Sequence, residues 1–158
     1  MDMAELERAL GDAASAGNLV WTATEADIPR ILTIAKDNYS EWIGVSDETL
    51  WVWAQNAIVA QHVGLFASKN GFAFGLLQPG PDLKMHARMP VLCCPDGKPG
   101  EAFFLAAAVV GWAQAMNAAD IYWDTHPDTE VDLGPFARKL GFMQLLGYFK
   151  DLRYERCC

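Results

Sequence analysis

Residues 91–105 have the residue types and the spacing of an anion-binding segment. Residues 91–94 predict the end of a strand, residues 95–99 predict a turn of Pro, Gly and Lys, and a strongly apolar helix is predicted from Gly100. A glycine-containing turn at a helix start leaves backbone N–H groups without helical partners, beside the positive end of the helix dipole. Such a turn can bind a phosphate or a pyrophosphate. The alternative is a plain strand-to-helix turn whose glycines serve geometry alone.

The same segment resembles motif A of the GCN5-related N-acetyltransferases, whose loop pattern is Gln/Arg-x-x-Gly-x-Gly/Ala. Gly100 and Ala102 match the last two anchor positions, whereas Gly97 stands where a basic or amide side chain is usual. Residues 136–142, Phe-Ala-Arg-Lys-Leu-Gly-Phe, are similar to the family's Phe-Tyr-Glu-Lys-Leu-Gly-Phe element, with Ala137 in place of a tyrosine that often serves as general acid. The resemblance covers nearly the whole chain in the order of its elements.

The resemblance implies acetyl-CoA as the cofactor and an amine as the acceptor. In the family, backbone N–H groups of the motif A loop bind the cofactor's pyrophosphate. The matching cofactor-binding residues here are Gly97, Lys98, Gly100, Glu101 and Ala102. Pro99 offers no N–H, and Lys98 could act as a point charge on a phosphate. The backbone around Leu92 or Cys93 would pair with the pantetheine arm.

Acetyl transfer to an amine requires a base for the ammonium proton and an acid for the leaving thiolate. No carboxylate lies on the predicted strand at residues 84–94, where the family often places its base. His86 is the candidate there because of its intrinsic pKa, and Asp124, near the end of the next predicted strand, is a second candidate base. Tyr148 is the nearest replacement for the missing tyrosine. The structural alternatives are a surface histidine, a carboxylate that caps a turn, and a half-buried strand tyrosine.

The elements around these residues predict an α/β (α+β) fold with a mixed central sheet of about six to seven strands and helices on both faces. Pro90 inside its strand predicts a bulge or a splay, because proline removes one ladder donor. Thr24, with Asp27 at the third position, and Ser46 predict helix N-caps. The helix after Thr24 should bury an apolar stripe, Ile28, Ile31, Leu32 and Ala35, and the helix at 100–116, apolar on nearly every side, should lie buried between layers. In order, we expect a strand at 19–22, helices from 24 and at 47–60, a hairpin of strands 63–68 and 72–77, a strand at 84–94, a helix at 100–116, a strand at 121–125, a helix at 132–140 and one or two strands at 142–152.

Length and composition predict one domain at residues 19–158, preceded by a helical extension at residues 1–18. The formal net charge of −8 argues against sequence-independent binding to nucleic acid or to anionic membranes. The cysteine pairs 93–94 and 157–158 and the scattered histidines lack metal-ligand spacing, so no metal is expected. Reduced thiols and the acidic first residues, which do not suit a signal peptide, predict a cytoplasmic location. The longest apolar run is too short for a membrane span.

Several aromatic residues near the first helices and the hairpin could either line an acceptor pocket or form core: Trp42, Trp51, Trp53, Phe72 and Phe74. Two functions remain open. The first is an acetyl-CoA-dependent N-acyltransferase for an unidentified amine. The second is a catalytically degenerate domain of the same fold that serves in binding or assembly, with a homo-oligomer or another protein as partner, for example in a bacteriophage particle (virion). An unrelated α/β nucleotide-binding domain is a third interpretation.

Overall fold

Five strands form one mixed sheet in the computed structural model, which describes residues 8, 20–38, 42, 44–95, 99–123 and 138–141. The strand order is β1-β2-β3-β4-β5, with antiparallel pairing as far as β4 and parallel pairing between β4 and β5. The bounds are Val20–Thr22 (β1), Val63–Ser68 (β2), Phe72–Pro79 (β3), Met85–Cys93 (β4) and Ile121–Trp123 (β5). Helix α5, Pro99–Ala115, connects the two parallel strands, in the predicted order of strand, helix and strand.

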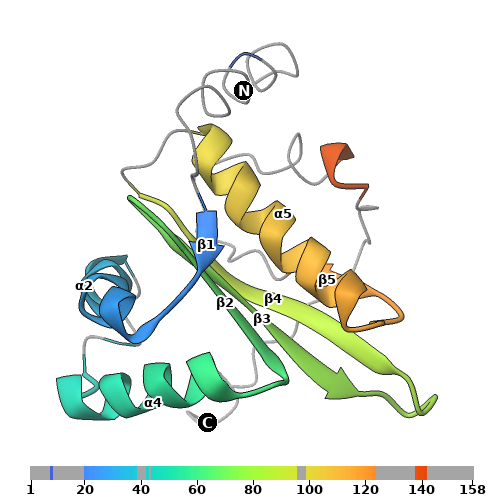
Figure 1. The fold of residues 1–158 in the computed structure, drawn as a ribbon, viewed down its shortest axis with the longest axis horizontal. Helices are drawn as coiled ribbons and strands as arrows, with labels where there is room; N and C mark the ends of the chain where they lie inside the picture. Colours follow the sequence, from blue (N-terminus) through green and yellow to red (C-terminus); the bar gives the residue numbers. More distant parts are fainter. Residues whose placement is uncertain are drawn as a thin grey trace, which may run out of the picture.

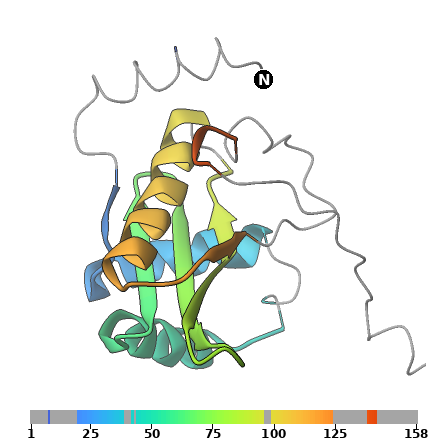
Figure 2. The same cartoon turned by 90° about the vertical axis from the view of Figure 1, so that its right-hand side faces the viewer.

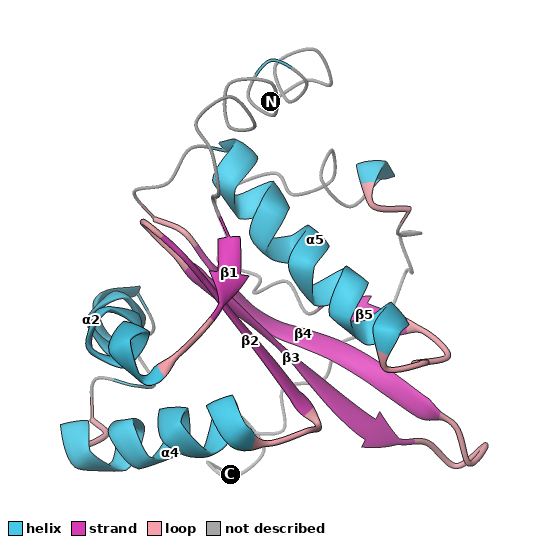
Figure 3. Ribbon diagram, in the orientation of Figure 1, coloured by secondary structure: helices cyan, strands magenta, loops and turns pink. Residues whose placement is uncertain are grey.

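Helices cover both faces of the sheet, which confirms the predicted architecture (Figure 1). Helices α2 (Ile28–Asn38) and α4 (Asp47–Val59) lie on one face, and α5 crosses the other face (Figure 2). Figure 3 shows the strands as a single layer between these helices. The strands and most of the helix predicted within residues 132–152, and the predicted extension at 1–18 apart from Arg8, lie outside the described residues.

The two helices of the first face begin at the predicted caps. The Asp27 carboxylate accepts hydrogen bonds from the backbone N–H and the hydroxyl of Thr24, at 2.9 and 3.1 Å, and a 3-10 turn, η1 (Glu25–Asp27), leads into α2. The hydroxyl of Ser46 accepts from the backbone N–H of Thr49 at the start of α4. The apolar stripe predicted for α2 is buried in full: Ile28, Ile31, Leu32 and Ala35.

On the opposite face, two glycines make room for one indole of α5. Gly64 of β2 and Gly75 of β3 are cross-strand partners. A Cβ atom added at Gly64 would lie 2.5 Å from Cδ2 of Trp112, and one added at Gly75 would lie 2.7 Å from Cζ3 of the same ring. Any side chain at either position would therefore collide with the indole, which packs directly on the sheet backbone.

Helix α5 is apolar on nearly every side, and the sequence predicts that it is buried between layers. The structure differs: one stripe is buried, while the remaining apolar residues are mostly half-buried. The buried stripe, which includes Leu105, Ala106 and Val109, packs on Ala73 and Met89 of the sheet. Outside the stripe, Phe103 and Phe104 contact each other edge to face, with ring centroids 5.9 Å apart. None of the helices in the described ranges has the length and apolar run needed to cross a bilayer.

Candidate functional site

Strand β4 contains a bulge at Met89 and Pro90, as the proline predicts. These two residues together face Gly75 alone, because the register shifts between the pairs Phe74–Val91 and Leu76–Arg88. The extra residue turns the following side chains to the other face of the sheet. Met89 accordingly packs in the core beneath α5, whereas Val91, two residues further on, packs in the core beneath α2 and α4.

The parallel pairing of β4 with β5 ends at this bulge in the described residues. The paired residues are Ala87–Ile121, Arg88–Tyr122 and Met89–Trp123. Val91 and Leu92 lie past the last pair. Within the described residues the ladder therefore stops at the bulge, and this geometry can admit an extended ligand beside the second half of β4.

Three elements meet at the C-terminal end of β4. The turn between β2 and β3 lies against it so closely that a Cβ atom at Gly71 would collide with the carbonyl oxygen of Cys93. The first turn of α5 is attached to the same hairpin turn through Glu101, whose carboxylate accepts from the backbone N–H of Asn70 at 2.8 Å and from its side-chain amide at 2.9 Å. The start of α5 thus has a fixed position relative to the end of β4.

Glu101 is 5% exposed and ionised at neutral pH. Burial works to raise the pKa of its carboxyl, but the hydrogen bonds from Asn70 and Ser68 and the charge of Arg30 outweigh burial and hold the pKa below its ordinary value of 4.5. The guanidinium of Arg30 donates to the Lys69 carbonyl at 2.8 Å, in the same turn. Sequence reasoning missed Asn70 and Arg30, because both reach this end of the sheet through tertiary contacts.

We expect Glu101→Gln to lower the free energy of unfolding at pH 7 by about 1–3 kcal/mol, because one carboxylate acceptor for Asn70 becomes an amide donor. A lowered pKa means that the carboxylate stabilises the fold above pH 4.5, and that this contribution is lost as the pH falls through the folded-state pKa. The difference from wild type should therefore shrink in acid, as measured by urea unfolding at several pH values. Glu25→Gln, at an exposed position, is the control. Equal stability of Glu101→Gln and wild type at pH 7 would contradict the proposed attachment.

The predicted cofactor-binding residues that the structure describes lie around this end of the sheet. Leu92 is half-buried and Cys93 is buried, both in the last part of β4. Gly100 and Glu101 are buried and Ala102 is half-buried, in the first turn of α5. The other predicted site residues lie outside the described residues, namely Gly97, Lys98, Asp124 and Tyr148.

His86 lies near the beginning of β4, before the bulge, between two carboxylates. Its Nδ1 is 2.7 Å from Oδ1 of Asp120, and its Nε2 is 2.8 Å from Oδ1 of Asp82. These contacts connect the loop before β4 to the loop before β5. Both ring nitrogens thus have carboxylate partners, and this arrangement favours a structural role over that of a general base. Proton transfer by His86 stays a prediction.

The stability of the fold should depend on the protonation of His86. Hydrogen bonds with Asp82 and then Asp120 raise the pKa of His86 above 6.5. The protonated histidine therefore stabilises the fold below pH 6.5, and this contribution is lost as the pH rises through the folded-state pKa. We expect His86→Gln to remove this decline in the melting temperature as the pH rises above 6.5. His62→Gln, at an exposed position, should keep the wild-type decline, and an identical profile in both variants would refute the assignment.

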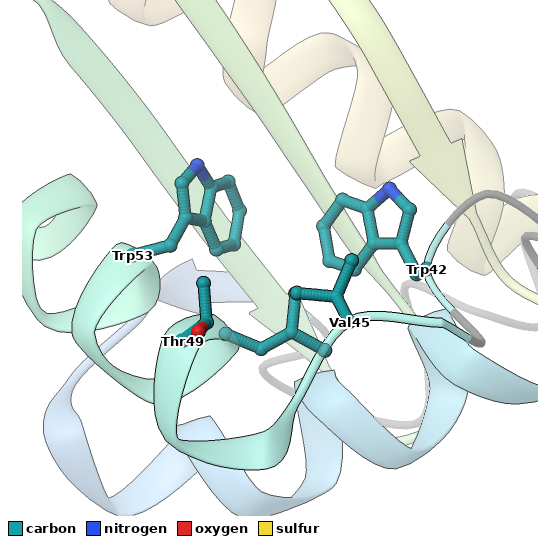
Figure 4. Close-up of a pocket in the computed structure, with 5 residues that line it drawn as sticks. Trp42, Val45, Thr49 and Trp53 are labelled. Carbon is teal, nitrogen blue, oxygen red and sulfur yellow. The ribbon is translucent and has the colours of Figure 1, made fainter.

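The five aromatic residues singled out in the sequence lie in three different environments. Phe72 and Phe74 are buried in the core, and Trp51 is on the outer side of α4 with 38% of its surface exposed. Trp42 and Trp53 are half-buried and line a pocket on the face of α2 and α4 (Figure 4). Two of these residues are therefore core, as one alternative predicts, and two others line a pocket, as the other alternative predicts.

The fold is shared with solved structures, several of which are named acetyltransferases. A putative acetyltransferase from Agrobacterium tumefaciens has a TM-score of 0.65 at 15% identity, over 84% of this chain and 97% of that chain. An aminoglycoside N-acetyltransferase in complex with CoA has a TM-score of 0.65 at 17% identity, over 84% and 93% of the two chains. A transcriptional regulator from Bacillus halodurans has a TM-score of 0.67 at 17% identity, over 84% and 97%.

No protein-family model matches the chain, and no curated protein matches its sequence. At these identities the structural likeness establishes the fold. The chain has the acyl-CoA N-acyltransferase fold, as the sequence resemblance predicts.

Proposed function

We propose that this chain is a divergent member of the GCN5-related N-acetyltransferases and transfers an acyl group from acyl-CoA to an amine. The observation that carries the proposal is the bulge at Met89 and Pro90, at the last pair of β4 with β5 that the described residues contain. The same strand leads to the start of α5, where a helix N-terminus begins with Pro99 and Gly100. The CoA complex of an aminoglycoside N-acetyltransferase with this fold supports an acyl-CoA ligand.

The described residues fit such a ligand in two places. Beside β4, the backbone of Leu92 and Cys93 would pair with the amides of the pantetheine arm, because β5 no longer pairs with β4 there in the described residues. At the start of α5, the dipole and the N–H groups that have no helical partner would bind the pyrophosphate. The proposed set here is Gly97, Lys98, Gly100, Glu101 and Ala102.

The charge of Glu101 opposes an anion at the same helix start. Its carboxylate, however, is turned to Asn70 in the hairpin turn and is held there by two hydrogen bonds. The Arg30 guanidinium, which also lowers the pKa of Glu101, partly balances this charge. The proposal therefore requires that the backbone N–H groups bind the pyrophosphate while the side chain serves the fold.

Acetyl-CoA supplies an acyl group activated as a thioester. The neutral amine attacks the thioester carbonyl carbon, so that a C–N bond forms as the C–S bond breaks and sulfur leaves with the electron pair. The ammonium proton must first pass to a base, the attacking nitrogen loses a second proton to water as the amide forms, and the thiolate is protonated by an acid or by water. Asp124 follows Trp123, the partner of Met89 at the bulge, and is the candidate base that we retain. Tyr148 remains the candidate acid.

Calorimetric titration with CoA, pantetheine and ADP tests the proposal. We expect CoA to bind, and both fragments to bind more weakly, because pantetheine uses only the edge of β4 and ADP uses only the start of α5. Transfer is then tested by mass spectrometry of acetyl-CoA with a panel of amines. Absence of CoA binding at millimolar concentration would overturn the proposal and leave the binding or assembly role. CoA binding without transfer to any amine would favour a catalytically degenerate domain.

A further inference from the structure

Glu101 occupies a position in α5 at which a glutamate usually caps its own helix. It is the third residue of the helix, which begins at Pro99. A glutamate at the third position commonly turns back and accepts from the backbone N–H that precedes the helix. The positive end of the helix dipole attracts the carboxylate in the same direction. In that arrangement the carboxylate would occupy the helix start, where the pyrophosphate is proposed to bind.

The structure shows the Glu101 carboxylate turned to the β2–β3 turn instead. Its Oε1 accepts from the backbone N–H of Asn70 at 2.8 Å, and its Oε2 accepts from the side-chain amide of Asn70 at 2.9 Å. Ser68 adds a further side-chain hydrogen bond, and the charge of Arg30 attracts the carboxylate. Because only 5% of Glu101 is exposed, water contributes little, and these protein groups set the direction of the carboxylate.

The turn that receives the carboxylate is held by contacts of its own. The backbone N–H of Ser68 donates to the carbonyl of Gly71 at 2.9 Å across the turn. The guanidinium of Arg30, on α2, donates to the carbonyl of Lys69 at 2.8 Å. Asn70 therefore has a fixed position that does not depend on the glutamate, and its amide can direct the carboxylate rather than follow it.

The carboxylate and a bound pyrophosphate would compete for the start of α5. Glu101 belongs to the first turn of this helix, so its carboxylate, once released from Asn70, would be an intramolecular ligand for the same N–H groups. A competitor attached to the site has a high effective concentration at any dilution of the protein. The helix start therefore stays open to an external anion only while the carboxylate is bound elsewhere.

We propose that Asn70 is a positioning residue of the pyrophosphate site: it binds the Glu101 carboxylate and thereby keeps this internal anion away from the start of α5. The inference rests on the proposed binding of CoA, and it gives the β2–β3 turn a part in ligand affinity. The turn and the start of α5 lie at the same end of the sheet (Figure 1). A purely structural Asn70 would affect stability, without an effect on ligand affinity that depends on Glu101.

A double-variant cycle for CoA affinity, measured by calorimetry, tests the proposal. Asn70→Ala removes the side-chain donor and should weaken CoA binding by about fivefold, because the helix dipole then attracts the freed carboxylate. Glu101→Gln replaces the carboxylate by a neutral amide and should strengthen CoA binding by at least about twofold, because one negative charge near the pyrophosphate is lost. In the Glu101→Gln background, Asn70→Ala should have no further effect on CoA affinity.

Urea unfolding of the same four proteins separates the ligand effect from folding. Both single variants lose a hydrogen bond and should unfold at a lower urea concentration than wild type, yet they should shift CoA affinity in opposite directions. Asn38→Ala, the same substitution at the exposed end of α2, should leave CoA affinity unchanged. The proposal fails if Asn70→Ala binds CoA as wild type does, or if it weakens binding equally in the Glu101→Gln background.

Inorganic pyrophosphate, followed by phosphorus NMR, separates this inference from the proposed function. CoA binding that Asn70→Ala leaves unchanged would refute the role of Asn70 and leave acyl transfer standing. If the chain binds pyrophosphate but not CoA, and Asn70→Ala weakens this binding, acyl transfer is refuted and Asn70 keeps the site open for a different ligand that contains a pyrophosphate. If wild type binds neither CoA nor pyrophosphate, both proposals fail.

Discussion

We expect Gly75→Ala to lower the free energy of unfolding by about 1–3 kcal/mol, because the added methyl group has no space. It would lie 2.7 Å from Cζ3 of Trp112 and 2.8 Å from Cγ1 of Val109, closer than carbon atoms approach in folded proteins. The indole must then move off the sheet, and β2, β3 and α5 lose packing together. Thermal or urea unfolding measures the loss.

The opposite glycine provides an internal test of this explanation. Gly64→Ala meets the same indole from the neighbouring strand and should cost a similar free energy. Because one displacement of Trp112 relieves the collisions of both new methyl groups with the indole, the double variant should lose less than the sum of the two single losses. Gly111→Ala in α5, where nothing lies near the new methyl group, should instead stabilise the fold by about 0.5–1 kcal/mol. The packing argument would be contradicted if the double variant lost the full sum of the two single losses in unfolding free energy, or if Gly75→Ala were as stable as wild type.

The second large effect concerns the proposed cofactor. We expect Gly100→Glu to weaken CoA binding by about 100-fold or more, because it places a second carboxylate in the first turn of α5, where an anion is proposed to bind. Gly100 is buried, so the larger side chain also occupies space beside the backbone. Calorimetry with CoA measures the loss.

Two further variants make the result interpretable. Gly111→Glu adds the same charge at an exposed position far along the same helix and should retain CoA affinity. If the melting transition shows that Gly100→Glu is unfolded, Gly100→Ala takes its place and should still weaken binding, because the methyl group enlarges a buried position. Wild-type affinity in a folded Gly100 variant would place the pyrophosphate elsewhere.

Local signals predicted much of the fold. Thr24 with Asp27, and Ser46 with the residues after it, mark helix starts that depend only on residues three positions away. The hairpin follows from two apolar runs around Asn70, and the bulge follows from Pro90, which cannot donate to the ladder. Such features are readable because their causes lie within a few residues of their effects.

The contacts that shape the candidate site have their causes much further away. Glu101 and Asn70 are 31 residues apart, and His86 and Asp120 are 34 residues apart. Neither pair follows a spacing that a helix or a hairpin would impose. The role of Gly64 and Gly75 likewise depends on Trp112, which only the docked helix brings to them. Sequence alone therefore identified His86 as a candidate but did not show that both of its ring nitrogens contact carboxylates.

The two attachments of α5 also have a mechanical consequence. Glu101 attaches the first turn of the helix to the hairpin turn at Asn70. Trp112, about three turns later on the same side, packs against Gly64 and Gly75. These two contacts prevent α5 from moving along its axis and from rotating about it. Inserting a single alanine between these anchors would advance the far one by about 1.5 Å and rotate it by about 100°, so that only one anchor could engage at a time. The rotational position of Trp112 relative to Glu101, rather than helix propensity, should therefore determine which insertions and deletions α5 tolerates.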